Sequence, residues 1–205
     1  MKESVTKMKH PFILIFIVIM ALSLRLYGLQ WDQGTHLHPD ERFLTMVAND
    51  AKLPDSFLAY LDPAQSSLNP YNIKYDFFVY GTLPLSIVKV LAVAGGFDNY
   101  DAITLLGRFL SALFVVGMLI VLFLLVLLFV KELRLDERLA YVSAFLYAVT
   151  VLPIQQSHFF TSDSFLVFFM MSSAYCAFRY YFHVKNFTRQ NIMPQEKKYI
   201  WLFFS

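Results

Sequence analysis

The sequence predicts an all-α integral membrane protein, a polytopic helix bundle whose long outer first loop contains surface helices. Hydrophobic residues make up 58% of the 205 residues, and the mean hydropathy is +0.53. Both values are typical of membrane proteins rather than of soluble domains. The apolar residues also gather into long runs that polar segments separate, which is the pattern that successive membrane spans produce.

The net charge and the cysteine content bear on nucleic-acid binding and on disulfide bonds. The net charge is only +2, so the composition gives no reason to expect nucleic acid as a partner. The single cysteine, Cys176, lies within an apolar run. A disulfide within the chain therefore cannot hold an outer loop together.

The first span is expected at about residues 11–29. No charged residue interrupts residues 11–24, and aromatic residues follow at the depth where their rings prefer the membrane interface. The alternative is a cleaved signal peptide with a small-residue site at residues 21–23. We favour an uncleaved span, because apolar character continues to residue 29 with only Arg25 inside it.

Later apolar runs predict further spans. The expected boundaries are 107–130, 138–154 and 163–182, and a fifth span begins at residue 199. This last run stops at Ser205, far short of the about 20 residues that a span requires. We therefore expect the chain to be a truncated part of a longer polytopic protein.

Residues 30–106 are expected to form a long outer loop with surface helices at about 39–49 and 83–94. For the second helix, Thr82 can cap the start, Pro84 fits a first turn and glycines follow the end. At 1.5 Å per residue, about a dozen residues cover about 18 Å, whereas the hydrocarbon core is about 30 Å thick. This helix is therefore too short to span by itself, and it either spans by recruiting residues 77–80 or lies along the membrane surface.

The distribution of basic residues predicts the orientation. If residues 83–94 lie on the surface, the amino terminus and the loops after the second and fourth spans share the cytoplasmic side. That side then holds Lys2, Lys7, Lys9, Lys131, Arg134, Arg138, Arg179, Lys185, Arg189, Lys197 and Lys198. If this helix spanned, the basic residues after the second and fourth spans would lie outside and leave the cytoplasmic loops poor in basic residues, so the bias favours the surface helix. The long first loop and residues 155–163 then share the outer face.

The stretch His36-Leu-His-Pro-Asp-Glu-Arg42 carries an acidic pair just after the first span, and acidic residues are costly near hydrocarbon. Pro39 suits the first turn of a helix. At 100° per residue, Asp40 is expected in the middle of an apolar face formed within residues 43–47, with Glu41 at its edge. Asp40 is therefore either a functional carboxylate or a cap for the free N–H groups of the helix.

Other polar side chains are expected at the same outer face. Arg108 precedes the second span, where it either holds an anionic head group or anchors the helix at the interface. Asp163 precedes the fourth span and either joins the site or caps the helix. His158 either binds a phosphate or packs against its neighbours. His36 and His38 alternate beside an acid like metal ligands on a strand, but this spacing is common and predicts no metal site.

Five motifs follow one another along the chain, and their order resembles the start of a GT-C glycosyltransferase. The resemblance is strongest to the phospholipid-carrier-dependent branch, family 39-like, which contains the protein O-mannosyltransferases and the lipid A aminoarabinose transferase. It implies that residues 1–205 are the N-terminal part of a single GT-C transmembrane domain. The motifs are Arg25-Leu-Tyr-Gly-Leu, Leu37-His-Pro-Asp-Glu-Arg, Phe78-Val-Tyr-Gly-Thr-Leu-Pro, Gly107-Arg-Phe-Leu-Ser-Ala-Leu and Gln155-Gln-Ser-His-Phe-Phe-Thr-Ser-Asp.

The resemblance also implies roles for the acids. Asp40 matches the catalytic acid of the first outer loop, with Glu41 as its acidic neighbour, and Asp163 matches the acid of the second outer loop. In the aminoarabinose transferase a lysine precedes the proline of the second surface helix, whereas residues 82–83 provide none here. That phosphate contact is therefore absent or comes from another cation such as Arg108, and the sugar and acceptor of that relative are not carried over.

Together these features predict a glycosyltransferase. It moves a sugar from a polyprenyl-phosphate donor to a hydroxyl of a protein, lipid or glycan acceptor, with inversion, at the outer face of a bacterial plasma membrane. Asp40 is expected to act as general base, and an outer cation to stabilise the leaving phosphate. Glu41 and Asp163 are expected to orient the acceptor, or to hold a divalent cation if the reaction uses one. The expected substrate-binding residues are His38, Arg42, Arg108, His158 and Asp163.

Two other functions compete with this prediction. In a transporter or flippase for a lipid-linked substrate, Asp40 and Arg108 would only bind or gate. The predicted spans show neither the inverted halves nor the interrupted helices typical of transporters. In a noncatalytic membrane subunit, Asp40 would be a helix cap alone. An assay for released polyprenyl phosphate separates the three functions.

Overall fold

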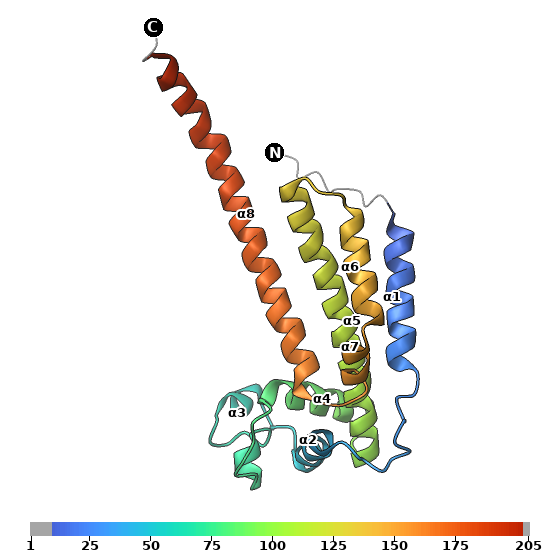
Figure 1. Cartoon of the computed structure of the whole chain (residues 1–205). Helices are drawn as coiled ribbons and strands as arrows, with labels where there is room; N and C mark the ends of the chain where they lie inside the picture. The colour runs from blue at the N-terminus through green and yellow to red at the C-terminus, as the bar shows by residue number, and fades with distance from the viewer. Residues whose placement is uncertain (1–9, 203–205) are drawn as a thin grey trace.

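The computed structural model describes residues 10–202, with side chains described through residue 188, and within this part it contains helices and loops but no β-strand (Figure 1). This confirms the predicted all-α fold. The elements in chain order are α1 (Pro11–Leu26), α2 (Pro39–Asp50), α3 (Phe57–Leu61), the 3-10 helix η1 (Pro70–Ile73), α4 (Thr82–Gly95), α5 (Tyr100–Leu133), α6 (Arg138–Val149), α7 (Val151–Gln156) and α8 (Ser162–Leu202).

The helices form a bundle with a separate layer across one end. α1, α5 and α6 run side by side, and α8 starts beside α5 and diverges toward its C-terminal end (Figure 1). α2, α3 and α4 lie across the end of the bundle from which α8 starts (Figure 1). The segment between α1 and α5 is thereby folded back against the bundle, which brings its polar residues to the ends of α1, α5 and α8.

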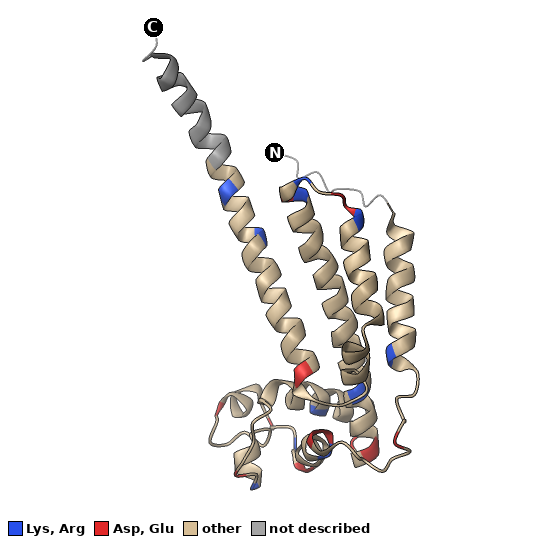
Figure 2. Ribbon diagram, viewed as in Figure 1, with Lys and Arg blue, Asp and Glu red and all other residues tan. Residues whose placement is uncertain are grey.

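Among the described residues, two helical stretches are long and apolar enough to cross a membrane, Tyr100–Leu133 and Ser162–Thr188. α1, α4 and α6 are apolar but shorter. Charged residues lie toward both ends of α5, at the C-terminal end of α1 and at the start of α6, and long stretches of these helices carry none (Figure 2). Membrane-spanning helices show this distribution, because a charge is costly in hydrocarbon.

Small residues bring the three bundle helices together. Ala140, Ala144 and Ala148 recur at every fourth position of α6 and are fully buried against α1 and α5, and small side chains let helix backbones approach closely. Arg25 is also fully buried. Its guanidinium donates to the carbonyl oxygens of Ala148 at 3.0 Å and Tyr147 at 3.3 Å, so it supplies partners to carbonyls where α6 ends.

Glycines set both ends of α4. Gly81 precedes the helix and Gly96 follows it, each with φ 73°, a conformation that glycine adopts without steric cost. Between them, the buried face of α4 packs on α2 and α5. Lys89 belongs to this buried face, and its ammonium pairs with Asp98 at 2.5 Å. This ion pair accounts for a basic residue in the middle of an apolar helix.

The third bundle helix, α6, is shorter than the span predicted at 138–154. α6 ends at Val149, and the chain continues as the separate α7. Thr150 has an extended backbone with ψ 128°, and Pro153 has no N–H to donate to the carbonyl of Val149. The helix therefore cannot continue through this point.

The last helix is longer than the span predicted at 163–182. α8 runs without a break from Ser162 to Leu202, so the connection expected over 183–198 is helical and no separate helix starts at residue 199. Residues 203–205 of the expected fifth span lie outside the described residues, as do Lys2, Lys7 and Lys9 of the expected cytoplasmic terminus.

Candidate active site

Two carboxylates clamp Arg108 where α2 crosses the start of α5. Nε and Nη2 of Arg108 donate to the two oxygens of Glu41 at 2.7 and 2.6 Å. Nη1 and Nη2 donate to the two oxygens of Asp32 at 3.0 and 2.7 Å, and Nη1 also donates to the carbonyl of Leu29 at 2.7 Å. A guanidinium has five N–H groups, and these five hydrogen bonds engage all of them.

The Asp32–Arg108–Glu41 cluster is shielded from solvent. The exposed fraction is 6% for Asp32, 1% for Arg108 and 0% for Glu41, and the ring of Trp31 covers the guanidinium at 5.5 Å. Burying charges is costly unless every group is paired, and here the pairing is complete. The hydrogen bonds from Arg108 lower the pKa of Asp32 to about 2, so Asp32 stays ionised at neutral pH.

Glu41 extends the cluster to the start of α8. Its Oε1 accepts a hydrogen bond from the backbone N–H of Phe160 at 2.7 Å. The Phe160 ring is fully buried against Gly107, where an added Cβ would lie 2.2 Å from the ring Cγ. Glycine at 107 therefore leaves room for the ring, and Arg108 beside it holds Glu41. This adjacent pair joins α2, α5 and the segment before α8.

The structure reverses the predicted orientation of the acidic pair. Glu41 is fully buried in a row with Leu44, Thr45 and Ala48, three, four and seven positions further along α2. Asp40 is exposed rather than set in the middle of the buried face. The prediction is wrong because it weighed apolar residues alone, whereas pairing with Arg108 makes Glu41 a buried residue.

His38, not Asp40, caps α2. Nδ1 of His38 accepts a hydrogen bond from the backbone N–H of Glu41 at 3.3 Å, and the His38 ring lies on Phe159 with centroids 4.2 Å apart. Asp40 Oδ1 instead accepts a hydrogen bond from the Tyr80 hydroxyl at 2.9 Å. The interpretation of Asp40 as the cap is therefore wrong, and its carboxylate faces the loop before α4.

Tyr80 is the site residue that the sequence did not reveal. Burial raises its pKa, and its hydrogen bond to Asp40 and the negative charges of Asp40 and Asp163 raise it further. The phenol therefore keeps its proton and donates to Asp40. The charge of Asp163, in the first turn of α8, acts on the same hydroxyl, so acids of α2 and α8 both influence Tyr80. Its one sequence signal is its place before Gly81, in a motif quoted above.

Two residues predicted to contact substrate are committed to the cluster. Arg108 has no N–H left for a phosphate. Both oxygens of Glu41 accept hydrogen bonds, and its side chain has no exposed surface. The predicted phosphate contact of Arg108, and direct action of Glu41 on an acceptor or a cation, therefore do not fit this arrangement.

His158 is likewise engaged by the backbone. Its two ring nitrogens lie 2.7 Å from the carbonyl oxygen of Ile154 and 2.8 Å from that of Tyr27. The ring thereby ties α7 to the segment after α1. Both ring nitrogens therefore already have backbone partners, and the expected phosphate contact of His158 does not fit this arrangement.

Arg42 and His36 lie apart from this cluster. Arg42 is exposed, and within the described side chains no carboxylate forms an ion pair with its guanidinium. His36 pairs with Asp101 at 2.9 Å rather than sharing a site with His38. In the described part of the chain, no three His, Cys, Asp or Glu side chains are placed to hold a metal ion.

Residues 91–204 match the family model described as dolichyl-phosphate-mannose-protein mannosyltransferase. The chain belongs to this family. The match covers the end of α4 and α5 to α8, so it includes Arg108, His158 and Asp163 but neither Asp40 nor Glu41. No curated protein and no solved structure matches the chain.

Membership of the dolichyl-phosphate-mannose-protein mannosyltransferase family makes the chain a glycosyltransferase of the GT-C type. It confirms the resemblance drawn from the motifs. Together with the two apolar helices, it also confirms the predicted integral membrane fold. The family places a lipid-linked sugar donor and a protein acceptor, in general terms, among the partners of such an enzyme.

Proposed function

We propose that this chain transfers a sugar from a polyprenyl-phosphate donor to a hydroxyl acceptor at the outer membrane face, with Asp40 as the general base. The observation that carries the proposal is the division between neighbouring acids. Glu41 is fully buried and bonded on both oxygens, whereas Asp40 is exposed and holds a single hydrogen bond from Tyr80. Of these two acids, only Asp40 is therefore open to a substrate.

The proposed step moves one proton and exchanges one bond. The acceptor hydroxyl attacks the anomeric carbon, its proton passes to Asp40, and the bond from that carbon to the phosphate oxygen breaks. Attack from the side opposite the phosphate inverts the sugar. Tyr80 donates to Oδ1 of Asp40, which fixes the carboxylate and leaves Oδ2 to take the proton. Asp163, which also acts on Tyr80, would orient the acceptor.

The leaving phosphate needs a positive charge. Arg108 cannot supply it directly, because its N–H groups are used in the cluster. We assign this contact to Arg42, the exposed basic residue of α2. His38, which packs on Phe159 at the start of α2 and is partly exposed, would contact the sugar.

An apolar cavity beside Asp163 supports a lipid-linked donor. It has a volume of about 230 Å³ between α5, α7 and α8, and Asp163 is among its lining residues. Other lining residues include Val115, Leu152 and Val167. A hydrocarbon chain in this cavity would keep its phosphate near the acids, as transfer from a membrane carrier requires.

The outer-face location rests on the positive-inside bias. Lys131, Arg134 and Arg138 lie at the turn between α5 and α6, at the end of the bundle opposite to the layer that contains Asp40 (Figure 1). With the basic turn in the cytoplasm, Asp40 faces the outside. For a bacterial plasma membrane this is the side away from the cytoplasm.

The test is transfer by the full-length protein in membranes, with polyprenyl-phosphate mannose as donor. Asp40→Asn is expected to lower the rate of polyprenyl phosphate release about 10²- to 10⁴-fold, because the general base is lost. Asp50→Asn is the matched control, since Asp50 is also exposed on α2 and bonded to a tyrosine hydroxyl. Equal rates for the two variants would remove Asp40 from the mechanism. Donor uptake without release would indicate a transporter or a binding subunit instead.

A further inference from the structure

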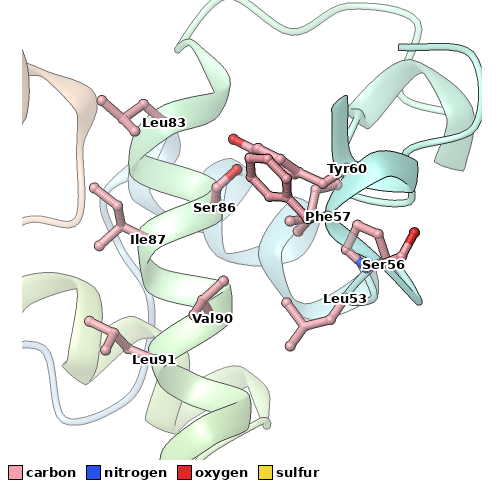
Figure 3. Close-up of a pocket in the computed structure, with 11 residues that line it drawn as sticks. Leu53, Ser56, Phe57, Tyr60, Leu83, Ser86, Ile87, Val90 and Leu91 are labelled. Carbon is pink, nitrogen blue, oxygen red and sulfur yellow. The ribbon is translucent and has the colours of Figure 1, made fainter. Parts of the chain in front are cut away.

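A second cavity lies between α3 and α4. Its larger part has a volume of about 550 Å³ and is lined almost wholly by apolar side chains. Phe57 and Tyr60 reach from α3 toward α4, where Ser86 and Val90 face them (Figure 3). The volume falls within the about 300–1,000 Å³ typical of small-molecule sites.

A smaller, more polar part adjoins the apolar one. It has a volume of about 340 Å³, and Tyr60, Leu68 and Ser86 line both parts. Its other lining residues include Asn69 and Thr82. The shared residues join the two parts into one cleft, which is apolar in its larger part and more polar in its smaller part. This division of polarity fits an amphiphile with a single chain.

The lining excludes a charged head group. None of the residues that line either part is Asp, Glu, Lys, Arg or His. A phosphate or carboxylate removed from water requires a cation or several N–H donors. The cleft therefore favours a polar end without charge, and this separates it from the phosphate-bearing carrier of the reaction.

Ser86 marks where the polar end would lie. Its side chain is buried, and among the described residues its hydroxyl has no hydrogen-bond partner. A buried hydroxyl without a partner is costly, and an oxygen of a ligand at the junction of the two parts would supply one.

The surroundings of the cleft are suited to capture from a bilayer. On α3, exposed fractions are 72% for Phe57, 78% for Leu58 and 56% for Leu61. Large apolar side chains exposed together mark a surface for membrane or ligand. We propose that this cleft binds an uncharged single-chain lipid, with its chain between α3 and α4 and its hydroxyl- or ester-bearing end at Ser86.

The test uses the full-length protein in lipid nanodiscs and a monoacylglycerol with a photoreactive group in its chain. Labelled peptides are expected within residues 53–60 and 83–91. Unlabelled monoacylglycerol is expected to compete, whereas the same chain carrying a phosphate head is not. Equal competition by the phosphate lipid, or labelling spread equally over α5 and α8, would overturn the proposal.

Two variants sharpen this test. Val90→Trp fills the apolar part and is expected to lower labelling about tenfold, whereas Leu113→Trp is the control on α5 at a comparable exposed fraction, 40% against 46%. Ser86→Ala is expected to weaken labelling by monoacylglycerol but not by a chain without the polar end. It removes a hydroxyl that has no partner, so the fold should persist. Equal labelling of both Trp variants would contradict the proposed site.

Discussion

α2 carries a carboxylate bonded to a tyrosine hydroxyl at each of its ends. At the start, Asp40 accepts from Tyr80 at 2.9 Å, and at the end, Asp50 accepts from Tyr75 at 2.7 Å. Phe43 lies between the two tyrosines, with ring centroids 5.8 Å from Tyr75 and 5.9 Å from Tyr80. The two pairs are thus alike in chemistry, and the Phe43 ring contacts both tyrosines.

Their surroundings differ. The pKa of Tyr75 is raised to about 12, mainly by burial and then by Asp50. The pKa of Tyr80 is raised by burial and by Asp40, and a second acid, Asp163 on α8, adds to it. The Asp40 end also adjoins the buried Asp32–Arg108–Glu41 cluster. The comparison teaches that an exposed acid next to a phenol occurs at both ends of α2, and that only the Asp40 end also has the buried ion pairs of α5 and the charge of an acid of α8 beside it.

Replacing the buried cation Arg108 is expected to have the largest effect, because Arg108 supports the Asp40 end of α2 and not the Asp50 end. Arg108→Met leaves two buried carboxylates without a cation, which is expected to lower the free energy of unfolding by about 3–5 kcal/mol. Thermal unfolding in detergent measures the change. Arg42→Met is the control, because Arg42 is exposed, and it should stay within about 0.5 kcal/mol of wild type. Similar melting temperatures for both variants would show that the cluster does not support the fold.

Low pH is expected to lower the stability of the folded chain by protonating Asp32, which lies near the Asp40 end of α2. The pKa of Asp32 is lowered from 3.8 to about 2 in the folded chain, so its contribution to stability is complete above pH 4 and is lost as pH falls toward 2. The contribution is about 2 kcal/mol. Melting temperature against pH should therefore fall over this window in wild type and in Asp50→Asn. In Asp32→Asn it should start lower at pH 7 and fall less, and an unchanged slope would contradict the assignment.

The two tyrosines should differ in activity by a smaller amount. Tyr80→Phe removes the donor that orients Asp40 and is expected to slow transfer about tenfold, the usual value of a hydrogen bond to a charged group. Tyr75→Phe removes the same bond at the other end of α2 and should leave the rate within about twofold, because Asp50 has no proposed role. Rates at saturating donor decide between them, and equal losses would show that the tyrosines act only through the fold.

Local signals in the sequence predicted the elements, and long-range contacts decided the site. Pro39 marks the start of α2, and Gly96 marks the end of α4. The burial of Glu41 could not be predicted, because its partner Arg108 lies 67 residues away. Tyr80 lies 40 residues from Asp40, and no spacing rule connects them. A helical wheel considers only residues of the same helix, which is why it predicted burial for Asp40 and not for Glu41.

The most direct measurement compares Asp40→Asn with Glu41→Gln, each with both melting temperature and transfer rate. Asp40→Asn should melt near wild type and lose transfer, because Asp40 is exposed and Glu41 still holds Arg108. Glu41→Gln should lose melting temperature, because it breaks the buried cluster. If Asp40→Asn transfers sugar at the wild-type rate, or Glu41→Gln keeps its melting temperature and loses only transfer, the assignment of the two acids is contradicted.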